Sequence, residues 1–239
     1  MESLLTEYAK KGNLDKVKNL VENGVNIHTN SENALRWSAA RGHLDVVKYL
    51  VEKGADIHVY SDRSTPYKPH GAVKYFINDT YISPCQALQL SAEFGHLDVV
   101  KYLVEKGADI HADNEGALHF SAEFGHLDVV KYLIEKGARI WTSVLEVSSG
   151  NGHLNIVKFL VEKNANILEY LNGPLQWSAH NGHLEVVKYL VEKGADVNVF
   201  SNNILQNSLC YNLDVKKFLT EKGAKEMDNF AFNNDKTFY

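Results

Sequence analysis

GHLDVVKYLVEKGADIH, residues Gly42–His58, is repeated along most of the chain. The stretches Gly95–His111 and Gly125–Ile140 follow it almost letter for letter. More divergent copies begin at Gly12, Gly152 and Gly182, and a worn copy begins at Asn212. Most neighbouring copies are about 30 residues apart, and a fixed period of this size predicts a stacked array of similar units. In such an array each unit buries its apolar face against its neighbours.

The apolar residues of this phrase follow a helical period. They fall on about half the circumference of a helix at roughly 100° per residue: Leu44, Val46, Val47, Leu50 and Val51. Gly54 comes next, where a helix needs a left-handed residue to close its last turn. In one copy Asn164 takes this place, and asparagine tolerates the left-handed conformation better than other non-glycine residues. The phrase therefore predicts an amphipathic helix that ends at a left-handed residue.

A shorter helical segment precedes each of five copies. These segments are Ala34–Arg41, Ala87–Phe94, Ala117–Phe124, Val144–Asn151 and Pro174–Asn181. Each carries a pair of small residues near its middle, such as Ser38-Ala39, which allows neighbouring helices to approach closely. Each repeat is therefore predicted to consist of a helix, a tight glycine turn, a second helix and a short loop.

This pattern resembles the ankyrin repeat. The family motif (T-P-L-H-x-A-A, G-H-L-E-V-V-K, G-A-D-V-N) is matched in the second helix and at the G-A-D end, whereas A-L-x-x-S-A replaces its first part. The repeats are about three residues shorter than the usual 33 of the family. The resemblance therefore implies an all-α ankyrin-repeat solenoid of helix-turn-helix units with short inter-repeat loops. The short period and the terminal histidine of G-A-D-I-H are most similar to ankyrin proteins of giant amoebal viruses, of the mimivirus type.

Residues 1–224 are expected to form the array, with about seven full repeats. The stretch 59–83 is either a degenerate repeat or an inserted loop: Ala72–Asp79 echoes the second helix, but Pro66 and Pro69 oppose a full first helix. Residues 225–239 lose the period, and we expect a frayed C-terminal tail, with a docking peptide as the alternative.

Composition and charge exclude several functions. The net charge of −5 disfavours a sequence-independent grip on nucleic acid. No apolar run approaches the roughly 20 residues that span a bilayer, and the acidic start Met1–Glu7 does not resemble a signal peptide. Cys85 and Cys210 have no paired spacing and indicate free thiols in a reducing compartment. We therefore expect a monomer in the cytoplasm, or in the host cytoplasm if the protein is viral.

Eleven histidines raise the question of metal binding. Five of them share one position beside the turn glycine: His43, His96, His126, His153 and His183. Rings one repeat apart are too distant to share a metal ion at about 2.1 Å from each nitrogen. The resemblance implies that these histidines bond neighbouring backbone instead, and we expect a structural role for His28, His58 and His111 as well. No metal and no cofactor are therefore expected.

No catalytic set is expected either. A Ser/His/acid triad cannot be assembled from repeat positions without predicting several copies, and no phosphate-cradling glycine loop occurs. Trp37 and Trp177 are predicted to lie in the core between repeats. An aromatic residue recurs at the edge of the second helix, where we expect it to cover the seam between repeats while a tyrosine hydroxyl reaches water: Tyr49, Tyr102, Tyr132, Phe159, Tyr189 and Phe218.

The resemblance implies that two positions before the turn glycine face the binding groove. The candidate partner-binding residues at these positions are Arg41, Glu93, Phe94, Glu123, Phe124, Asn151, His180 and Asn181. Phe94 and Phe124 form an apolar centre with polar neighbours, as in many interfaces. The alternative is that both cover the turn of the next repeat. Asn198, in LVEKGADVN, resembles the site that asparaginyl hydroxylases modify in ankyrin domains.

The predicted function is therefore non-catalytic binding of a partner protein along the concave groove. Two alternatives stay open. The first is a substrate-recruiting adaptor for a host ubiquitin ligase, although no ligase-docking box is recognisable in the sequence. The second is a self-associating structural scaffold of near-identical repeats.

Overall fold

The computed structural model describes residues 2–30, 32–59, 86–198 and 212–224. These residues form thirteen α-helices and one 3-10 helix, and none of them lies in a β-strand. The all-α fold predicted from the repeats is confirmed. The chain divides into an N-terminal unit, Met1–Val144, and a C-terminal unit, Leu145–Tyr239.

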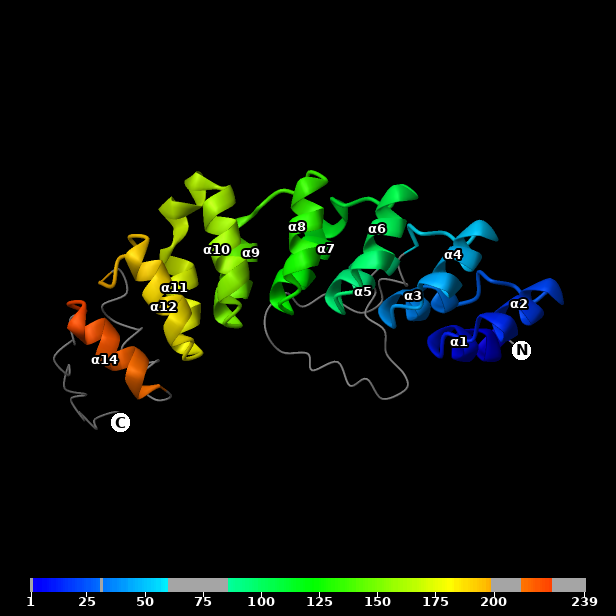
Figure 1. Cartoon of the computed structure of the whole chain (residues 1–239), viewed down its shortest axis with the longest axis horizontal. Helices are drawn as coiled ribbons and strands as arrows, with labels where there is room; N and C mark the ends of the chain where they lie inside the picture. The colour runs from blue at the N-terminus through cyan, green and yellow to red at the C-terminus, as the bar shows by residue number, and fades with distance from the viewer. Residues whose placement is uncertain (1, 31, 60–85, 199–211, 225–239) are drawn as a thin grey trace, which may run out of the picture. The chain divides into compact units, whose positions relative to one another are not determined.

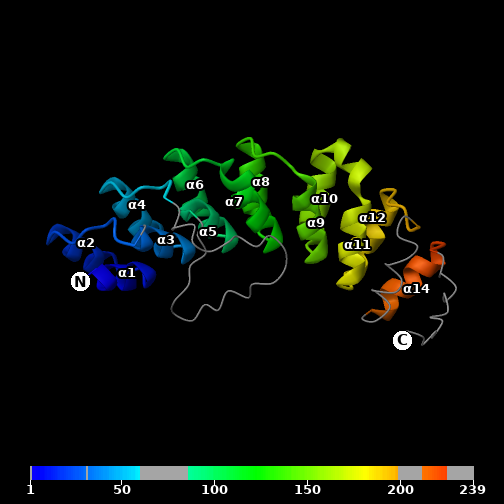
Figure 2. The ribbon, with the colours of Figure 1, turned by 180° about the vertical axis from the view of Figure 1, so that it is seen from behind.

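The N-terminal unit consists of four helix pairs. They are α1 (Glu2–Lys10) with α2 (Leu14–Glu22), α3 (Asn33–Ala40) with α4 (Leu44–Glu52), α5 (Ala87–Glu93) with α6 (Leu97–Glu105), and α7 (Ala112–Glu123) with α8 (Leu127–Glu135). Figures 1 and 2 show the first helices α1, α3, α5 and α7 packed side by side in one row, and the second helices in another. Each helix pair of this unit therefore packs against the next, as the sequence period predicts.

The C-terminal unit is also built of helices in sequence, but a 3-10 helix, η1, is inserted between α10 and α11. Its elements are α9 (Thr142–Gly150), in which the division of the chain falls, α10 (Leu154–Lys163), the 3-10 helix η1 (Ala165–Tyr170), α11 (Asn172–His180), α12 (Leu184–Glu192) and α14 (Leu213–Glu221). The second helices α10 and α12 pack together, and α14 packs against α12.

Small residues allow the first helices to pack closely, as predicted. The serine at their centre is fully buried, and its Oγ donates a hydrogen bond to the carbonyl oxygen three residues earlier, as from Ser91 to Leu88 over 2.9 Å. The same bond occurs at Ser38, Ser121, Ser148 and Ser178. A hydroxyl without this partner would be costly to bury, so the serine is small and also internally satisfied.

The glycine after the second helix adopts the predicted left-handed conformation, with φ of 97° at Gly54. The prediction for Asn164 is wrong: its φ is −134° and its ψ is 95°, which is extended backbone. A residue with a Cβ loses about 1 kcal/mol or more in the left-handed region. The chain avoids that cost here because α10 runs on to Lys163 and leads through Asn164 into the 3-10 helix η1.

The histidine beside the first turn glycine ties a repeat to the one before at four places in the described part of the chain. Its Nε2 donates to a backbone carbonyl of the preceding first helix, as from His96 to Ala40 over 3.1 Å and from His126 to Glu93 over 2.8 Å. His43 and His183 make the same bond, and Asn212 replaces it in the worn repeat with a bond to Gly182. The structural role predicted for these histidines is confirmed.

The loop histidines His28 and His111 also have structural partners. The Nδ1 of His111 lies 2.8 Å from a carboxylate oxygen of Glu115, and His28 pairs with Glu32 in the same way. Both glutamates are buried and have a positive φ, 66° at Glu115 and 59° at Glu32. These hydrogen bonds therefore hold the loop in a conformation that side chains rarely adopt.

The outer row of tyrosines differs from the prediction. The hydroxyls of Tyr49, Tyr102, Tyr132 and Tyr189 are buried, and no group in the described part of the chain forms a hydrogen bond with them. Two lysines instead stack on each ring; at Tyr102 they are Lys48 and Lys106, with ammonium groups 5.7 and 5.6 Å from the ring centroid. These cations lie over the ring, and the buried hydroxyl does not reach water, contrary to the prediction.

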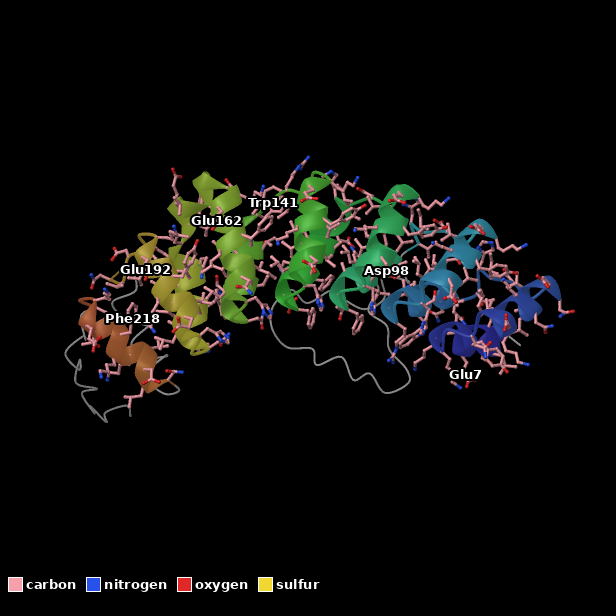
Figure 3. All side chains as sticks on the ribbon, in the orientation of Figure 1. Glu7, Asp98, Trp141, Glu162, Glu192 and Phe218 are labelled. Atoms are coloured by element: carbon pink, nitrogen blue, oxygen red, sulfur yellow. The ribbon has the colours of Figure 1, made fainter. Side chains whose placement is uncertain are left out.

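Burial raises the pKa of each of these tyrosines, and glutamates of the second helices raise it further. For Tyr189 the glutamates are Glu162 and Glu192, labelled in Figure 3 on α10 and α12. Burial and these carboxylates both favour the neutral phenol. Phe159 and Phe218 occupy the same position without a hydroxyl, and Lys163 and Lys222 lie over their rings.

Several predictions concern residues outside the described part of the chain. They are the degenerate repeat or loop at 59–83, of which only Val59 is described, the tail at 225–239, and the thiols of Cys85 and Cys210.

Candidate partner-binding surface

The candidate residues of the N-terminal unit lie at the C-terminal ends of the first helices. Arg41, Phe94 and Phe124 each follow the last residue of α3, α5 and α7 and act as its C-cap. All three side chains are exposed, with 37% of Phe94 and 45% of Phe124 accessible to solvent. Large apolar side chains thus emerge at the same place in two consecutive repeats.

Glu93 and Glu123 precede these phenylalanines and differ from each other. Glu93 is only 6% exposed, whereas Glu123 is half-buried. Burial raises the pKa of Glu93 to about 7, and the nearby charge of Glu123 adds to the rise. Glu123 itself has a basic neighbour, since its Oε2 lies 3.8 Å from the Nδ1 of His119. Ionisation of Glu93 is therefore unfavourable in the free chain.

Trp37 provides an aromatic platform beside Arg41. The ammonium of Lys10 lies 4.4 Å from the centroid of the indole ring, and the guanidinium of Arg41 lies 5.8 Å from it. Trp37 is half-buried rather than fully enclosed. In contrast, Leu90 and Phe120, at the equivalent position, are buried with Ala40 in a cluster between α3, α5 and α7.

The candidate residues of the C-terminal unit are all exposed, but two of them have backbone partners. The Nδ2 of Asn151 donates to the carbonyl of Val147 over 2.9 Å, and the Nδ2 of Asn181 donates to Gly150 over 2.6 Å. These amides are therefore partly committed to the fold.

His180 lies beside Trp177, with ring centroids 6.5 Å apart in an edge-to-face arrangement. The prediction that Trp177 lies in the core is wrong, because 47% of its side chain is exposed. A Cβ added to Gly150 would already lie 3.3 Å from the Cβ of Trp177, so the two helices leave no room for an indole between them. The ring therefore extends onto the surface next to His180.

Sequence reasoning thus missed two aromatic residues of this surface. Trp37 and Trp177 precede the candidate residues Arg41 and Asn181 by four positions, which places them on the same helix face. The sequence spacing therefore could have predicted both residues.

Asn198 is exposed in the loop after α12, where its backbone N–H donates to an Asp196 carboxylate oxygen over 2.8 Å.

Other chemistry finds little support in the described residues. Across the described ranges no three histidine, cysteine or acidic side chains are grouped in a way that could hold a metal ion. Nor does any helix within those ranges have the length and apolar character needed to cross a membrane.

Comparison with known proteins identifies the family. The family model described as ankyrin repeats matches three times, at residues 2–61, 67–144 and 141–201. The crystal structure of the human ASB11 ankyrin repeat domain superposes with a TM-score of 0.72 and 22% sequence identity, covering 92% of this chain and 98% of that one. At this identity the likeness shows a common fold. No curated protein matches the sequence significantly. Since the family model accounts for most of the chain, the chain belongs to the ankyrin repeat family.

Proposed function

We propose that the chain binds a partner protein through the ends of its first helices, along the face that forms the concave groove in ankyrin proteins. Ankyrin repeats generally mediate protein–protein interactions and are typically non-catalytic. The observation that carries the proposal is the exposure of Phe94 and Phe124 at equivalent places in consecutive repeats. In the N-terminal unit the surface comprises Arg41, Glu93, Phe94, Glu123 and Phe124, which we call the acidic–aromatic surface.

The energetics suit such a role. Full burial of a phenylalanine stabilises by about 1.5–3 kcal/mol, so burying the 37% of Phe94 and the 45% of Phe124 that are exposed would contribute roughly 0.6–1.3 kcal/mol each. Both rings are fixed to helix ends that the free chain already holds in place, so little ordering entropy is lost on binding. Arg41, stacked on Trp37, supplies a polar rim of the kind found around apolar interface centres.

The C-terminal unit carries a second, smaller set. We propose that Asn151, His180 and Asn181 contact the same partner, with Trp177 as the apolar anchor. Support comes from the exposed indole and the imidazole packed against it.

The test is a double substitution, Phe94→Ala with Phe124→Ala, in the full chain. A partner is isolated by affinity capture from the native cell, purified, and titrated calorimetrically against both forms. We expect a loss of more than about 1 kcal/mol in binding free energy. Tyr170→Ala is the matched control, because this aromatic is 56% exposed but lies in η1, away from the first-helix ends. Equal affinity of the double variant and the parent chain would contradict the proposal.

We further propose that the chain acts as a monomer in the cytoplasm, in a host cell if it comes from a giant amoebal virus, and that it binds neither nucleic acid nor membrane. The net charge of −5 supports the proposal that it does not bind nucleic acid. Light scattering at two concentrations distinguishes a monomer from a self-associating scaffold, which would grow in mass with concentration.

A further inference from the structure

We propose that the acidic–aromatic surface receives a lysine or arginine side chain of the partner, held between the Glu93 and Glu123 carboxylates and the rings of Phe94 and Phe124. The inference rests on the proposed function and deepens it by naming the chemistry of the partner.

The burial of Glu93 supports a cation site on this surface. Only 6% of the residue is exposed, and within the described part of the chain its carboxylate has no hydrogen bond or ion pair. Buried carboxylates are normally paired, because an unpaired charge out of water is strongly unfavourable. Glu93 therefore has an unused capacity to accept a charged donor.

The groups that surround Glu93 also favour a cation from outside the chain. Helix α5 packs against α3, α6 and α7. The charged or titratable groups on these elements and their caps include Arg36, Arg41, His96, Asp98, His119, Glu123 and His126, of which Glu123 acts on the Glu93 carboxyl.

Each basic side chain among these groups interacts with a group other than the Glu93 carboxylate. An Nη1 of Arg36 donates to Asn33, and Arg41 stacks on Trp37. The Nε2 atoms of His96 and His126 bond backbone carbonyls, and His119 faces Glu123. Burial is the main cause of the raised pKa of Glu93, about 7, and the nearby negative charge of Glu123 adds to it. A cation from outside the chain would complement both carboxylates.

The exposed phenylalanines favour a cation that carries an apolar stem. Phe94 and Phe124 are exposed next to the carboxylates, and the long apolar stems of lysine and arginine pack well on such rings while the charged head reaches an acid. The chain already uses this chemistry one repeat away, where Lys10 and Arg41 lie on the Trp37 ring. A basic side chain with an apolar neighbour therefore fits the surface better than a small inorganic cation.

The test uses defined peptides. A phage-displayed library of random dodecapeptides is selected on the full chain at pH 8, and enriched peptides are measured by fluorescence anisotropy. We expect every binder to contain lysine or arginine, and the double variant Glu93→Gln/Glu123→Gln to bind roughly tenfold more weakly or worse. Replacing the basic residue by norleucine is expected to cause a similar loss with the parent chain and little further loss with the double variant. Glu135→Gln, an exposed glutamate on α8, is the matched control and keeps full affinity.

The outcomes separate this inference from the proposed function. Binders without a basic residue, or affinity for the glutamine double variant within about twofold of the parent chain, would overturn the cation site. If those peptides still lost affinity on Phe94→Ala/Phe124→Ala, the partner-binding surface would stand without it. Peptides that bind all variants equally, or a library that yields no binder, would count against both. Thermal unfolding followed by circular dichroism verifies that each variant is folded.

Discussion

Replacing Glu93 by glutamine should make the protein more stable at neutral and alkaline pH. The pKa of Glu93 rises from its ordinary value of 4.5 to about 7, chiefly through burial and secondarily through Glu123. The folded chain therefore holds this proton more tightly than the unfolded chain does. The resulting stability is fully present below about pH 4.5 and is lost as the pH rises through about 7.

The magnitude follows from the size of the shift. Each pKa unit corresponds to about 1.4 kcal/mol, so ionisation of Glu93 costs the folded state about 3 kcal/mol. Glutamine keeps the shape of the protonated acid and does not ionise. The difference in unfolding free energy, Glu93→Gln minus parent, is thus expected to increase by up to about 3 kcal/mol between pH 4.5 and pH 8.

Urea unfolding followed by circular dichroism, at half-unit pH steps, measures this difference. All other titrating groups occur in both proteins, and their contributions largely cancel. A constant offset from burying an amide would shift the whole curve without changing its slope. Glu135→Gln, the exposed control, should give a flat difference. A flat curve for Glu93→Gln as well would show that Glu93 is hydrated or paired, and would refute the reasoning.

Three further predictions concern the repeats. Tyr102→Phe removes a buried hydroxyl without a hydrogen-bond partner among the described residues, so thermal unfolding should show unchanged stability or a gain of about 1 kcal/mol; a clear loss would reveal a bonded hydroxyl. Gly42→Ala should destabilise more than Gly54→Ala in urea unfolding: both have a positive φ, but only at Gly42 does the new Cβ meet a side chain, 2.5 Å from the Nδ1 of His96. Equal losses would mean that this contact relaxes freely. Asn198, exposed after α12, is expected to gain 16 mass units on treatment with an asparaginyl hydroxylase, and an unmodified peptide would reject that site.

The helices could be predicted from the sequence because their signals are local. The apolar period within each copy, the turn glycines and the repeat spacing together imply helix pairs that stack. The histidine bonds between repeats follow from a residue that recurs at one position of a known family motif. These features depend on residues that lie close together in the sequence, so each copy of the repeat predicts the same local structure.

The details of the surface could not be predicted, because they depend on neighbours in space. Ser91–Phe94 and Ser121–Phe124 have the same sequence, SAEF, yet Glu93 is buried and Glu123 is only half-buried. Trp177 is exposed although leucine and phenylalanine at the equivalent position are buried, since the space between two helices depends on both of them. The closed tyrosine hydroxyls depend likewise on lysines from two different repeats.

Hydrogen–deuterium exchange on the full chain, with and without its captured partner, tests most directly whether the ends of the first helices form the binding surface. The account predicts that exchange slows on binding in the peptides that contain Phe94 and Phe124. Slowing confined to the second helices α6 and α8, with these peptides unchanged, would place the partner on the opposite row and contradict it.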